Sequence, residues 1–255
     1  MKKLSELKIK VFGDGADMAG ILELSRKPYI KGFTTNPTLM RKAAVPDYEA
    51  FAMQVLEHIK DRPVSFEVIA DDEEVMESQA RYIAKWGSNV YVKIPVTNTR
   101  REPMYELIER LSRDGIQVNV TAMLTLEQVR EVTKALQRGA PSNVSVFAGR
   151  IADTGRDPVQ MMIEAVKMVR ENEHSELIWA SPRELLNIFQ ADEIGCHIIT
   201  VTNDILGKLS LIGKDLDDFS LETVKMFYDD AVKSGYALEA APVGVRVAVR
   251  NRESF

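Results

Sequence analysis

Lys93 holds the most chemically unusual position in the sequence, because it lies between Val92 and Ile94 in an apolar run. Lysine is almost never fully buried in a protein unless it has a partner or a function. Burial disfavours the charged form of the amine and lowers its pKa, and the neutral amine can attack a carbonyl carbon. The residues alone leave two structural alternatives open: Lys93 could reach solvent at the edge of the fold, or pair with Glu67 without doing chemistry.

Carboxylates occur near two other apolar runs, at Asp14 and Glu67. A carboxylate within hydrogen-bond reach of a substrate hydroxyl or a water can transfer a proton to or from it. The alternative is that both carboxylates only balance the charge of Lys93. Either interpretation requires the fold to bring the three side chains together.

Two arginines, Arg150 and Arg183, follow later apolar runs, and each comes after a nearby serine. A single arginine most often forms a surface ion pair. Two arginines past the ends of neighbouring strands are better suited to an anion pocket, such as a phosphate site. The 3 histidines share no spacing typical of metal ligands, so the sequence predicts no metal site.

The chain alternates between short β-branched runs and amphipathic stretches, which is typical of βα units around a parallel sheet. Strands are predicted over residues 8–12, 30–33, 64–69, 89–95, 117–121, 143–147, 177–180 and 197–201. Helices are predicted over 72–85, 103–111, 125–136, 158–169 and 221–238. This pattern predicts one α/β domain over 1–255, a single (β/α)8 TIM barrel with a C-terminal helix. A doubly wound open sheet is the rival fold, but the turn at 13–15 lacks the third glycine of a nucleotide-binding turn.

Catalytic groups in such a barrel collect at the carboxyl ends of the strands. Polar side chains interrupt or follow most of the predicted strands at that end, and residues two apart on one strand face the same side. The candidate site residues are Asp14, Thr34, Asn36, Glu67, Lys93, Asn119, Thr121, Ser145, Phe147, Arg150, Ser181 and Arg183.

The composition argues against several other classes of protein. The chain has 255 residues and a formal net charge of −5, which argues against a broad nucleic-acid-binding surface. No apolar run is long enough to predict a membrane span. Cys196 is the only cysteine, so no intramolecular disulfide can form, and we expect a reducing, cytoplasmic location.

Four segments resemble signatures of the transaldolase family, in the order in which the family has them. Residues 32–37 (GFTTNP) resemble G-x-T-T-N-P, and residues 92–97 (VKIPVT) resemble K-[IV]-P-x-T, the segment with the Schiff-base lysine. Residues 115–121 (GIQVNVT) resemble G-I-x-x-N-x-T, and residues 145–153 (SVFAGRIAD) resemble S-P-F-V-G-R-I-x-D. The resemblance covers most of the chain.

The resemblance implies a transaldolase of carbohydrate metabolism, in the pentose phosphate pathway. Such an enzyme moves a dihydroxyacetone unit from a ketose phosphate, such as sedoheptulose 7-phosphate or fructose 6-phosphate, to an aldose phosphate. It needs no metal or cofactor, and it is expected to be a homo-oligomer, either a decamer or a dimer. For catalysis, the resemblance implies Lys93 as the Schiff-base nucleophile, Asp14 as the base at the C4 hydroxyl, and Glu67 and Thr121 as holders of a water that shuttles protons. For binding, it implies that Asn36, Asn119 and Ser181 hold the dihydroxyacetone unit. It implies that Arg150 and Arg183 hold the phosphate.

Two positions separate transaldolases from the related fructose-6-phosphate aldolases, which release free dihydroxyacetone. The aldolases tend to carry Gln in place of Glu67 and Tyr in place of Phe147, so the chain resembles the transaldolases at both positions. Residues 98–103 (NTRREP), Val146 and Pro182 depart from the family pattern, and the first segment adds positive charge at the rim of the pocket. The alternatives are an aldolase, an enzyme for another sugar phosphate or for a sulfonated or nucleotide-linked ketose, and a non-catalytic barrel that binds a sugar phosphate.

Overall fold

The computed structural model describes residues 4–236 and residue 238, which divide after Ser210 into two compact units. The first unit contains every strand that the structure describes. The second contains the last described helix. The organisation of 1–255 as one domain therefore stays a prediction.

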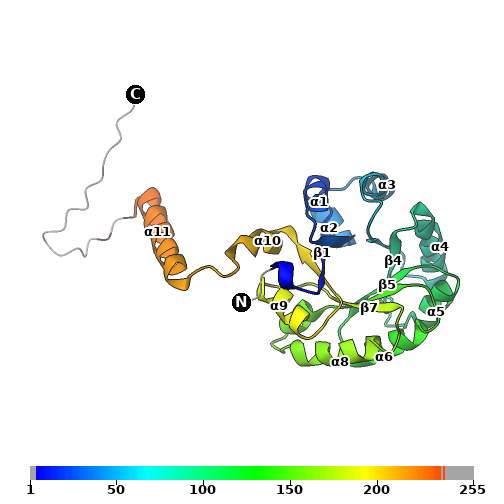
Figure 1. Ribbon diagram of the computed structural model, residues 1–255. Coiled ribbons are helices and arrows are strands. Elements are labelled where there is room, and N and C mark those ends of the chain that lie inside the picture. Colours follow the sequence, from blue (N-terminus) through cyan, green and yellow to red (C-terminus); the bar gives the residue numbers. More distant parts are fainter. Residues whose placement is uncertain (1–3, 237, 239–255) are drawn as a thin grey trace, which may run out of the picture. The chain divides into compact units, whose positions relative to one another are not determined.

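The first unit is a closed barrel of eight parallel strands in chain order, which confirms the predicted (β/α)8 TIM barrel. Helices surround the sheet on its outside (Figure 1). Each predicted strand overlaps an observed one, because alternating βα units leave the β-branched runs buried inside a ring of helices. The strands are β1 (Lys10–Asp14), β2 (Ile30–Thr34), β3 (Val64–Glu67), β4 (Val90–Pro95), β5 (Val118–Met123), β6 (Ser142–Val146), β7 (Ser175–Trp179) and β8 (Ile198–Thr202).

The helices of the first unit follow the strands and differ in length. The α-helices are α1 (Met18–Ser25), α2 (Pro37–Lys42), α3 (Tyr48–His58), α4 (Glu73–Ile83), α5 (Tyr105–Arg113), α6 (Leu126–Ala135), α7 (Ala148–Ala152), α8 (Val159–Val169), α9 (Leu186–Glu193) and α10 (Asn203–Leu206). Short 3₁₀ turns lie at Leu4–Glu6, Ala84–Trp86 and Gly207–Leu211.

Local contacts decide where two of the predicted helices begin, and for one of them the contact is a cap. Helix α6 starts at a capping box, in which the hydroxyl of Thr125 accepts from the N–H of Gln128 and the Gln128 side chain accepts from the N–H of Thr125. The predicted start of α5 at Pro103 is wrong. Pro103 instead forms an isolated bridge with Thr97, and the helix begins at Tyr105.

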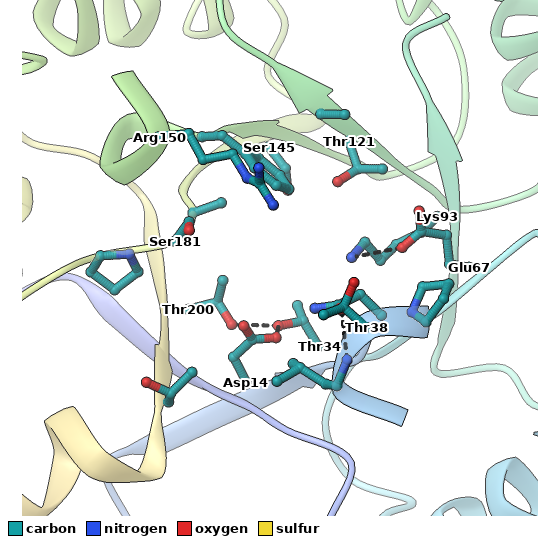
Figure 2. Close-up of a pocket in the computed structure, with 18 of the residues that line it drawn as sticks. Asp14, Thr34, Thr38, Glu67, Lys93, Thr121, Ser145, Arg150, Ser181 and Thr200 are labelled. Carbon is teal, nitrogen blue, oxygen red and sulfur yellow. Dashed lines mark hydrogen bonds and ion pairs between the residues drawn. The ribbon is translucent and has the colours of Figure 1, made fainter. Parts of the chain in front are cut away.

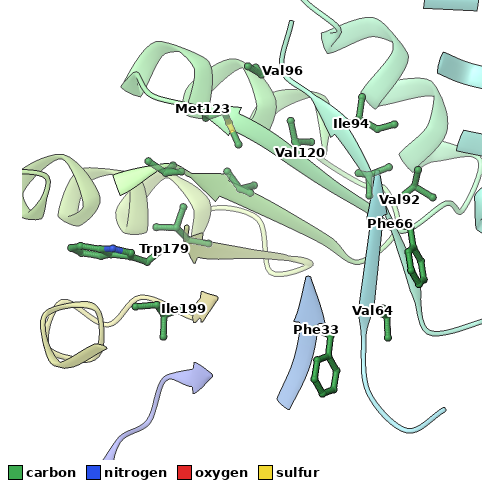
Figure 3. Packing of buried hydrophobic residues seen from close by; sticks show 14 of the residues in the cluster. Phe33, Val64, Phe66, Val92, Ile94, Val96, Val120, Met123, Trp179 and Ile199 are labelled. Atoms are coloured by element: carbon green, nitrogen blue, oxygen red, sulfur yellow. The ribbon is translucent and has the colours of Figure 1, made fainter. Parts of the chain in front are cut away.

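Two apolar layers hold the barrel together. The larger one fills the space between the outer face of the sheet and the helices, and Figure 3 shows residues of this layer on several strands, including Val92, Ile94 and Val120. A smaller cluster fills the interior of the barrel and consists of Phe12, Ile178, Ala180 and Ile198, with Phe147 against it. Gly32 also faces inward, and a Cβ there would lie 2.5 Å from the ring of Phe12, so only glycine fits.

The second unit contains α11 (Leu216–Ser234), which is longer at its start than the helix predicted over 221–238. Asp215 caps it by accepting from the N–H groups of Asp217 and Asp218. Gly235 ends it in the left-handed conformation, with φ at 68°. Part of the predicted end, at residue 237, lies outside the described residues. Among the described helices, none combines the length and the apolar character that a membrane span requires.

Candidate active site

A cavity of about 620 Å³ opens at the carboxyl ends of the strands, where the barrel architecture predicts the site. All the candidate residues from the sequence line it, and Figure 2 shows most of them converging on the same space. They are Asp14, Thr34, Asn36, Glu67, Lys93, Asn119, Thr121, Ser145, Phe147, Arg150, Ser181 and Arg183. The fold therefore brings together side chains that lie far apart in the sequence.

Lys93 points into this cavity from β4 and is only 5% exposed. Its Nζ donates to the carbonyl oxygen of Thr35 at 2.9 Å and lies 3.2 Å from Oε2 of Glu67. The alternative in which Lys93 reaches solvent at the edge of the fold is wrong. The contact with Glu67 gives the amine a proton acceptor within reach, in a place shielded from bulk water.

Glu67 is placed by its strand and by a tyrosine from the next layer. It pairs with Lys93 in the register of β3 and β4, so their side chains lie on the same inner face. The hydroxyl of Tyr48 donates to the carbonyl oxygen of Glu67 at 2.7 Å, which fixes the end of β3. The carboxylate is partly exposed to the cavity and is free to exchange a proton with a bound molecule.

Asp14 is the second carboxylate of the cavity, and it lies at the end of β1. Burial raises the pKa of its carboxyl, while the positive charge of Lys93 and a hydrogen bond from Thr34 oppose this effect and the charge of Glu67 adds to it. The hydroxyl of Thr34 donates to Oδ1 of Asp14 at 2.8 Å. A carboxyl with a raised pKa inside a cleft is suited to take up and release a proton.

Two amide side chains are already engaged by the protein. Asn119 donates to the hydroxyl of Ser65 at 3.0 Å and accepts from the hydroxyl of Ser145 at 2.7 Å, so its orientation is fixed from both ends. The oxygen of Asn36 accepts from the N–H of Leu39 at 3.0 Å and caps α2. The amide nitrogen of Asn36 is left to donate to a bound molecule.

Thr121 has a buried hydroxyl at this cavity to which the described residues give no hydrogen bond. It is 2% exposed, and its hydroxyl oxygen has no hydrogen-bond partner in the part of the chain that the structure describes. A buried hydroxyl without a partner costs free energy, so a water or a ligand group is expected beside it. The next residue, Ala122, has φ at 66° at a register shift between β5 and β6, and this irregularity sets the direction of the strand end.

The two arginines differ in what they offer an anion. Arg183 donates from Nε to Asp153 at 2.8 Å and from a second nitrogen to the other oxygen of that carboxylate, and it also donates to the hydroxyl of Ser181 at 3.0 Å. Arg150 lies 5.8 Å from the ring centre of Phe147 and forms no ion pair with a carboxylate among the described residues, although its charge helps to lower the pKa of Asp153. Of the two arginines, Arg150 is therefore the freer to bind an anion, while Arg183 is largely neutralised by Asp153.

Close backbone packing joins the last two motifs. Gly149 in α7 lies against Ser181, and a Cβ on Gly149 would come 1.6 Å from the carbonyl oxygen of Ser181. Ser181 itself has φ at 60°, a conformation that is uncommon for residues other than glycine. The position of Ser181 at the cavity thus depends on a glycine at position 149 of the neighbouring helix.

The (β/α)8 barrel occurs in many unrelated protein families, so the fold alone does not identify the family. The sequence model of the family described as Transaldolase/Fructose-6-phosphate aldolase matches residues 11–241. The chain belongs to this family.

Curated relatives agree with this family assignment. A protein described as probable transaldolase 2, from Listeria monocytogenes, is 36% identical over 203 residues, which are 79% of this chain and 88% of that protein. A probable transaldolase from Dehalococcoides mccartyi is 34% identical over 199 residues, which are 78% of this chain and 88% of that protein.

The solved structures are more distant. Dihydrodipicolinate synthase from Rhodopseudomonas palustris has a TM-score of 0.55 at 13% identity, covering 91% of this chain and 82% of that chain. A mandelate oxidase variant has a TM-score of 0.53 at 16% identity, covering 85% of this chain and 71% of that chain. At these identities the similarity shows the fold alone.

Several residues that the sequence analysis did not single out also line the cavity. They include Thr38, Lys42, Thr200, Thr202 and Asp204. The two threonines of β8 carried a usable signal, because polar residues at alternate positions of an apolar strand face the same side. The other three follow strand ends on short helices, where sequence alone gives no direction for a side chain.

Residues 98–103, which depart from the family pattern, hold one of their two arginines in ion pairs. Arg100 pairs with Glu102 at 2.9 Å and with Asp71 at 3.4 Å, so its charge is compensated. Thr99 donates to Asp71 from both its N–H and its hydroxyl, which ties the segment to the loop after β3. The positive charge expected of this segment is therefore compensated at Arg100, whereas Arg101 forms no ion pair among the described residues.

Metal ligands do not gather anywhere in the described part of the chain: no group of three or more His, Cys, Asp or Glu side chains there could hold an ion.

Proposed function

We propose that the chain is a transaldolase, which transfers a dihydroxyacetone unit from a ketose phosphate to an aldose phosphate through a Schiff base on Lys93. The observation that carries the proposal is the shielded Nζ of Lys93, 3.2 Å from Oε2 of Glu67, in a cavity that also holds Asp14 and Arg150 (Figure 2). Membership of the transaldolase and aldolase family supports it.

The first step forms the covalent intermediate. Glu67 takes a proton from the ammonium group of Lys93, and the electron pair of the neutral amine attacks the C2 carbonyl carbon of the donor. The resulting carbinolamine takes up a proton on its hydroxyl, through a water held between Glu67 and Thr121, and loses that hydroxyl as water. The product is an iminium ion between Nζ and C2. The unpartnered hydroxyl of Thr121 supports this placement of the water.

The second step breaks the carbon chain. Asp14 takes the proton of the C4 hydroxyl, the C3–C4 bond breaks, and its electron pair moves into the iminium to give an enamine. The fragment that begins at C4 leaves as an aldehyde. An acceptor aldehyde then binds, C3 of the enamine attacks it, and Asp14 returns its proton to the new hydroxyl. Water finally releases the product from Lys93.

Specificity is proposed to come from the polar groups around the amine and from the arginine opposite it. The amide nitrogen of Asn36, with Asn119 and Ser181, would hold the dihydroxyacetone unit, while Thr34 and Ser145 keep Asp14 and Asn119 in place. Arg150 would hold the phosphate, with Arg183 as its second ligand. Sugar phosphates are thus the proposed partners.

Transfer is proposed over release because of the side chain at the edge of the interior cluster. Phe147 packs against that cluster and has no hydroxyl with which to hold a water near the enamine. Without a proton donor there, the enamine persists until an acceptor aldehyde arrives. A fructose-6-phosphate aldolase is the alternative, and Phe147→Tyr is expected to raise release relative to transfer.

Borohydride trapping tests the proposal. Reduction in the presence of fructose 6-phosphate is expected to fix the three-carbon unit on Lys93, located by mass spectrometry of peptides. Lys42 also lines the cavity and serves as an internal comparison, since it should stay unmodified. Lys93→Ala should lose both the adduct and turnover while keeping the circular dichroism of the fold.

Three results would contradict the proposal in different ways. No adduct on any lysine would favour a barrel that only binds a sugar phosphate. Free dihydroxyacetone in the absence of an acceptor would favour an aldolase. An adduct without turnover of these sugars would point to another ketose as donor, which a screen of phosphorylated and sulfonated ketoses would identify.

A further inference from the structure

Three oxygen atoms form a hydrogen-bonded row on the side of the cavity away from Lys93 (Figure 2). The hydroxyl of Thr34 donates to Oδ1 of Asp14 at 2.8 Å. The same hydroxyl is hydrogen-bonded to the hydroxyl of Thr200. Thr200 lines the cavity and has no role in the proposed reaction steps.

The direction of this row follows from counting protons. A threonine hydroxyl has one proton to donate and can accept from other donors. While Asp14 is ionised, Thr34 gives its proton to the carboxylate, so Thr200 donates the bond between the two hydroxyls. Both protons therefore point toward Asp14, and Oδ1 of that carboxylate is the end of the row.

Strand geometry explains why the two threonines meet. Strands β2 and β8 flank β1 on its two sides, and inward-facing residues of alternate strands share a layer of the barrel interior. Thr34 is in register with Asp14, whereas Thr200 is in register with Phe12, one inward-facing position further down β1. The residues Thr34 and Thr200 are 3% and 5% exposed, so water cannot easily replace either bond.

We propose that Thr200 is a positioning residue for Asp14. Through Thr34 it keeps a proton donor on Oδ1, and it leaves Oδ2 to take the proton of the substrate hydroxyl. The proposal rests on the proposed function in one respect, which is that Asp14 transfers a proton during the reaction. The hydrogen-bonded row itself is a property of the protein without substrate.

Other charged groups also surround Asp14 and affect its ionisation. Lys93 from β4 favours the ionised carboxylate, and Glu67 from β3 disfavours it. Asp17, Lys42 and Asp204 line a neighbouring hollow that also reaches Asp14, but they lie toward solvent. The one hydrogen bond that the described residues give the Thr200 side chain goes to Thr34 and to none of these groups, so a change confined to Thr200 leaves the surrounding charges in place.

The test is Thr200→Val, which keeps the shape of the side chain and removes its hydroxyl. Thr34 then loses the donor that polarises it, its bond to Asp14 weakens, and the titration midpoint of Asp14 moves to higher pH. Infrared spectroscopy of protein labelled with [¹³C]aspartate measures this midpoint, with the signal of Asp14 isolated by subtracting the Asp14→Asn form of each variant. In the enzyme, the acid limb of the kcat/KM profile should move in the same direction, and kcat/KM near that limb should fall about three- to tenfold.

Two further variants separate this role from a structural one. Thr200→Ser restores a hydroxyl and should return the titration midpoint and the pH profile toward those of the unchanged protein. Thr133→Val also removes a buried threonine hydroxyl, one that bonds the carbonyl of Val129 within α6, and it should leave both readouts unchanged. If Thr200→Val proves unfolded by circular dichroism, Thr200→Ala replaces it.

The outcomes for this role and for the proposed function can be told apart. A folded Thr200→Val protein with an unmoved Asp14 midpoint overturns the role, whatever the enzyme does. A moved midpoint that Thr200→Ser reverses supports the role even if no transaldolase activity is found. An equal shift in Thr133→Val would show a general response to losing a buried hydroxyl and would also overturn it.

Discussion

Asp14 carries a stability cost that its proposed role explains. Burial raises the pKa of its carboxyl above the ordinary value of 3.8, so the charged form is disfavoured in the folded protein. The cost is present in full above the folded pKa, and it disappears as the pH falls through that value toward 3.8 and the carboxyl becomes protonated in both states. Sites selected for chemistry often keep such costs.

Asp14→Asn is therefore expected to raise the thermal midpoint at neutral pH and to abolish turnover. The gain should vanish near pH 3.8, where the native carboxyl is already protonated. Asn keeps the shape of the side chain and an oxygen that can accept from Thr34, so packing is nearly unchanged. Scanning calorimetry of both proteins at the two pH values measures the difference. A variant that is less stable than the original at neutral pH would refute the argument.

Arg150 should matter more than Arg183 for phosphate binding, because Asp153 already occupies the guanidinium of Arg183. Arg150→Gln is expected to cost about 1.5–3 kcal/mol of binding with a phosphorylated donor, the range for a hydrogen bond to a charged group. Arg183→Gln should cost less. Steady-state kinetics with fructose 6-phosphate and with fructose measure both losses. If Arg150→Gln weakens the two donors equally, the arginine is not a phosphate ligand.

The sequence predicted the residues of the cavity better than the contacts among them. Lys93, Glu67 and Asp14 could be found because a charged residue in or at the end of an apolar run is visible in one dimension. The pairing of Arg183 with Asp153 could not, since it depends on how two loops of neighbouring βα units face each other. The same holds for Thr200, whose partner Thr34 is placed by closure of the barrel.

At the scale of elements, the backbone of α7 approaches β7 so closely that one glycine decides the fit. Gly149→Ala is expected to destabilise the protein by about 1–3 kcal/mol, the usual range for overpacking, although Ala is the better helix former. The added Cβ would displace the carbonyl of Ser181, so KM for the phosphorylated donor should also rise.

Gly207→Ala is the matched control, because a Cβ there meets nothing within 4 Å and its φ of −58° suits Ala. It should be neutral or stabilise the protein by about 0.4–1 kcal/mol. Urea unfolding compares the two variants. Equal stabilities for both would mean that the contact between α7 and β7 relaxes without cost.

Element types were predictable because the periods of helix and strand differ, but element ends depended on local partners. The strand predicted over 64–69 ends at Glu67, and the helix predicted from Pro103 begins at Tyr105. In the second case a proline that would suit a helix start pairs with Thr97 instead. Such choices are made by tertiary contacts, which a periodic pattern does not contain.

At the scale of the whole molecule, the barrel has buried apolar layers, whereas α11 has no buried residue among those described. All described side chains of α11 are at least partly exposed, including Leu216, Phe219, Leu221, Val224, Met226, Phe227, Tyr228 and Val232. Most of the stability of a helix in a protein comes from the packing of its apolar face, and exposed apolar patches on stable proteins usually mark an interface. The homo-oligomer expected from the family resemblance would supply a surface of this kind.

Phe219→Glu and Phe227→Glu should accordingly reduce the mass of the full chain in light scattering after size exclusion, because each places a charge where an apolar contact is expected. Ser220→Glu, next to the first position and already polar, should leave the mass unchanged. Circular dichroism should be alike in all three, since the barrel has a closed sheet and its own apolar layers. A monomeric original chain would remove the reason to assign α11 to assembly. An oligomer that tolerates both charges would place its interface on another surface.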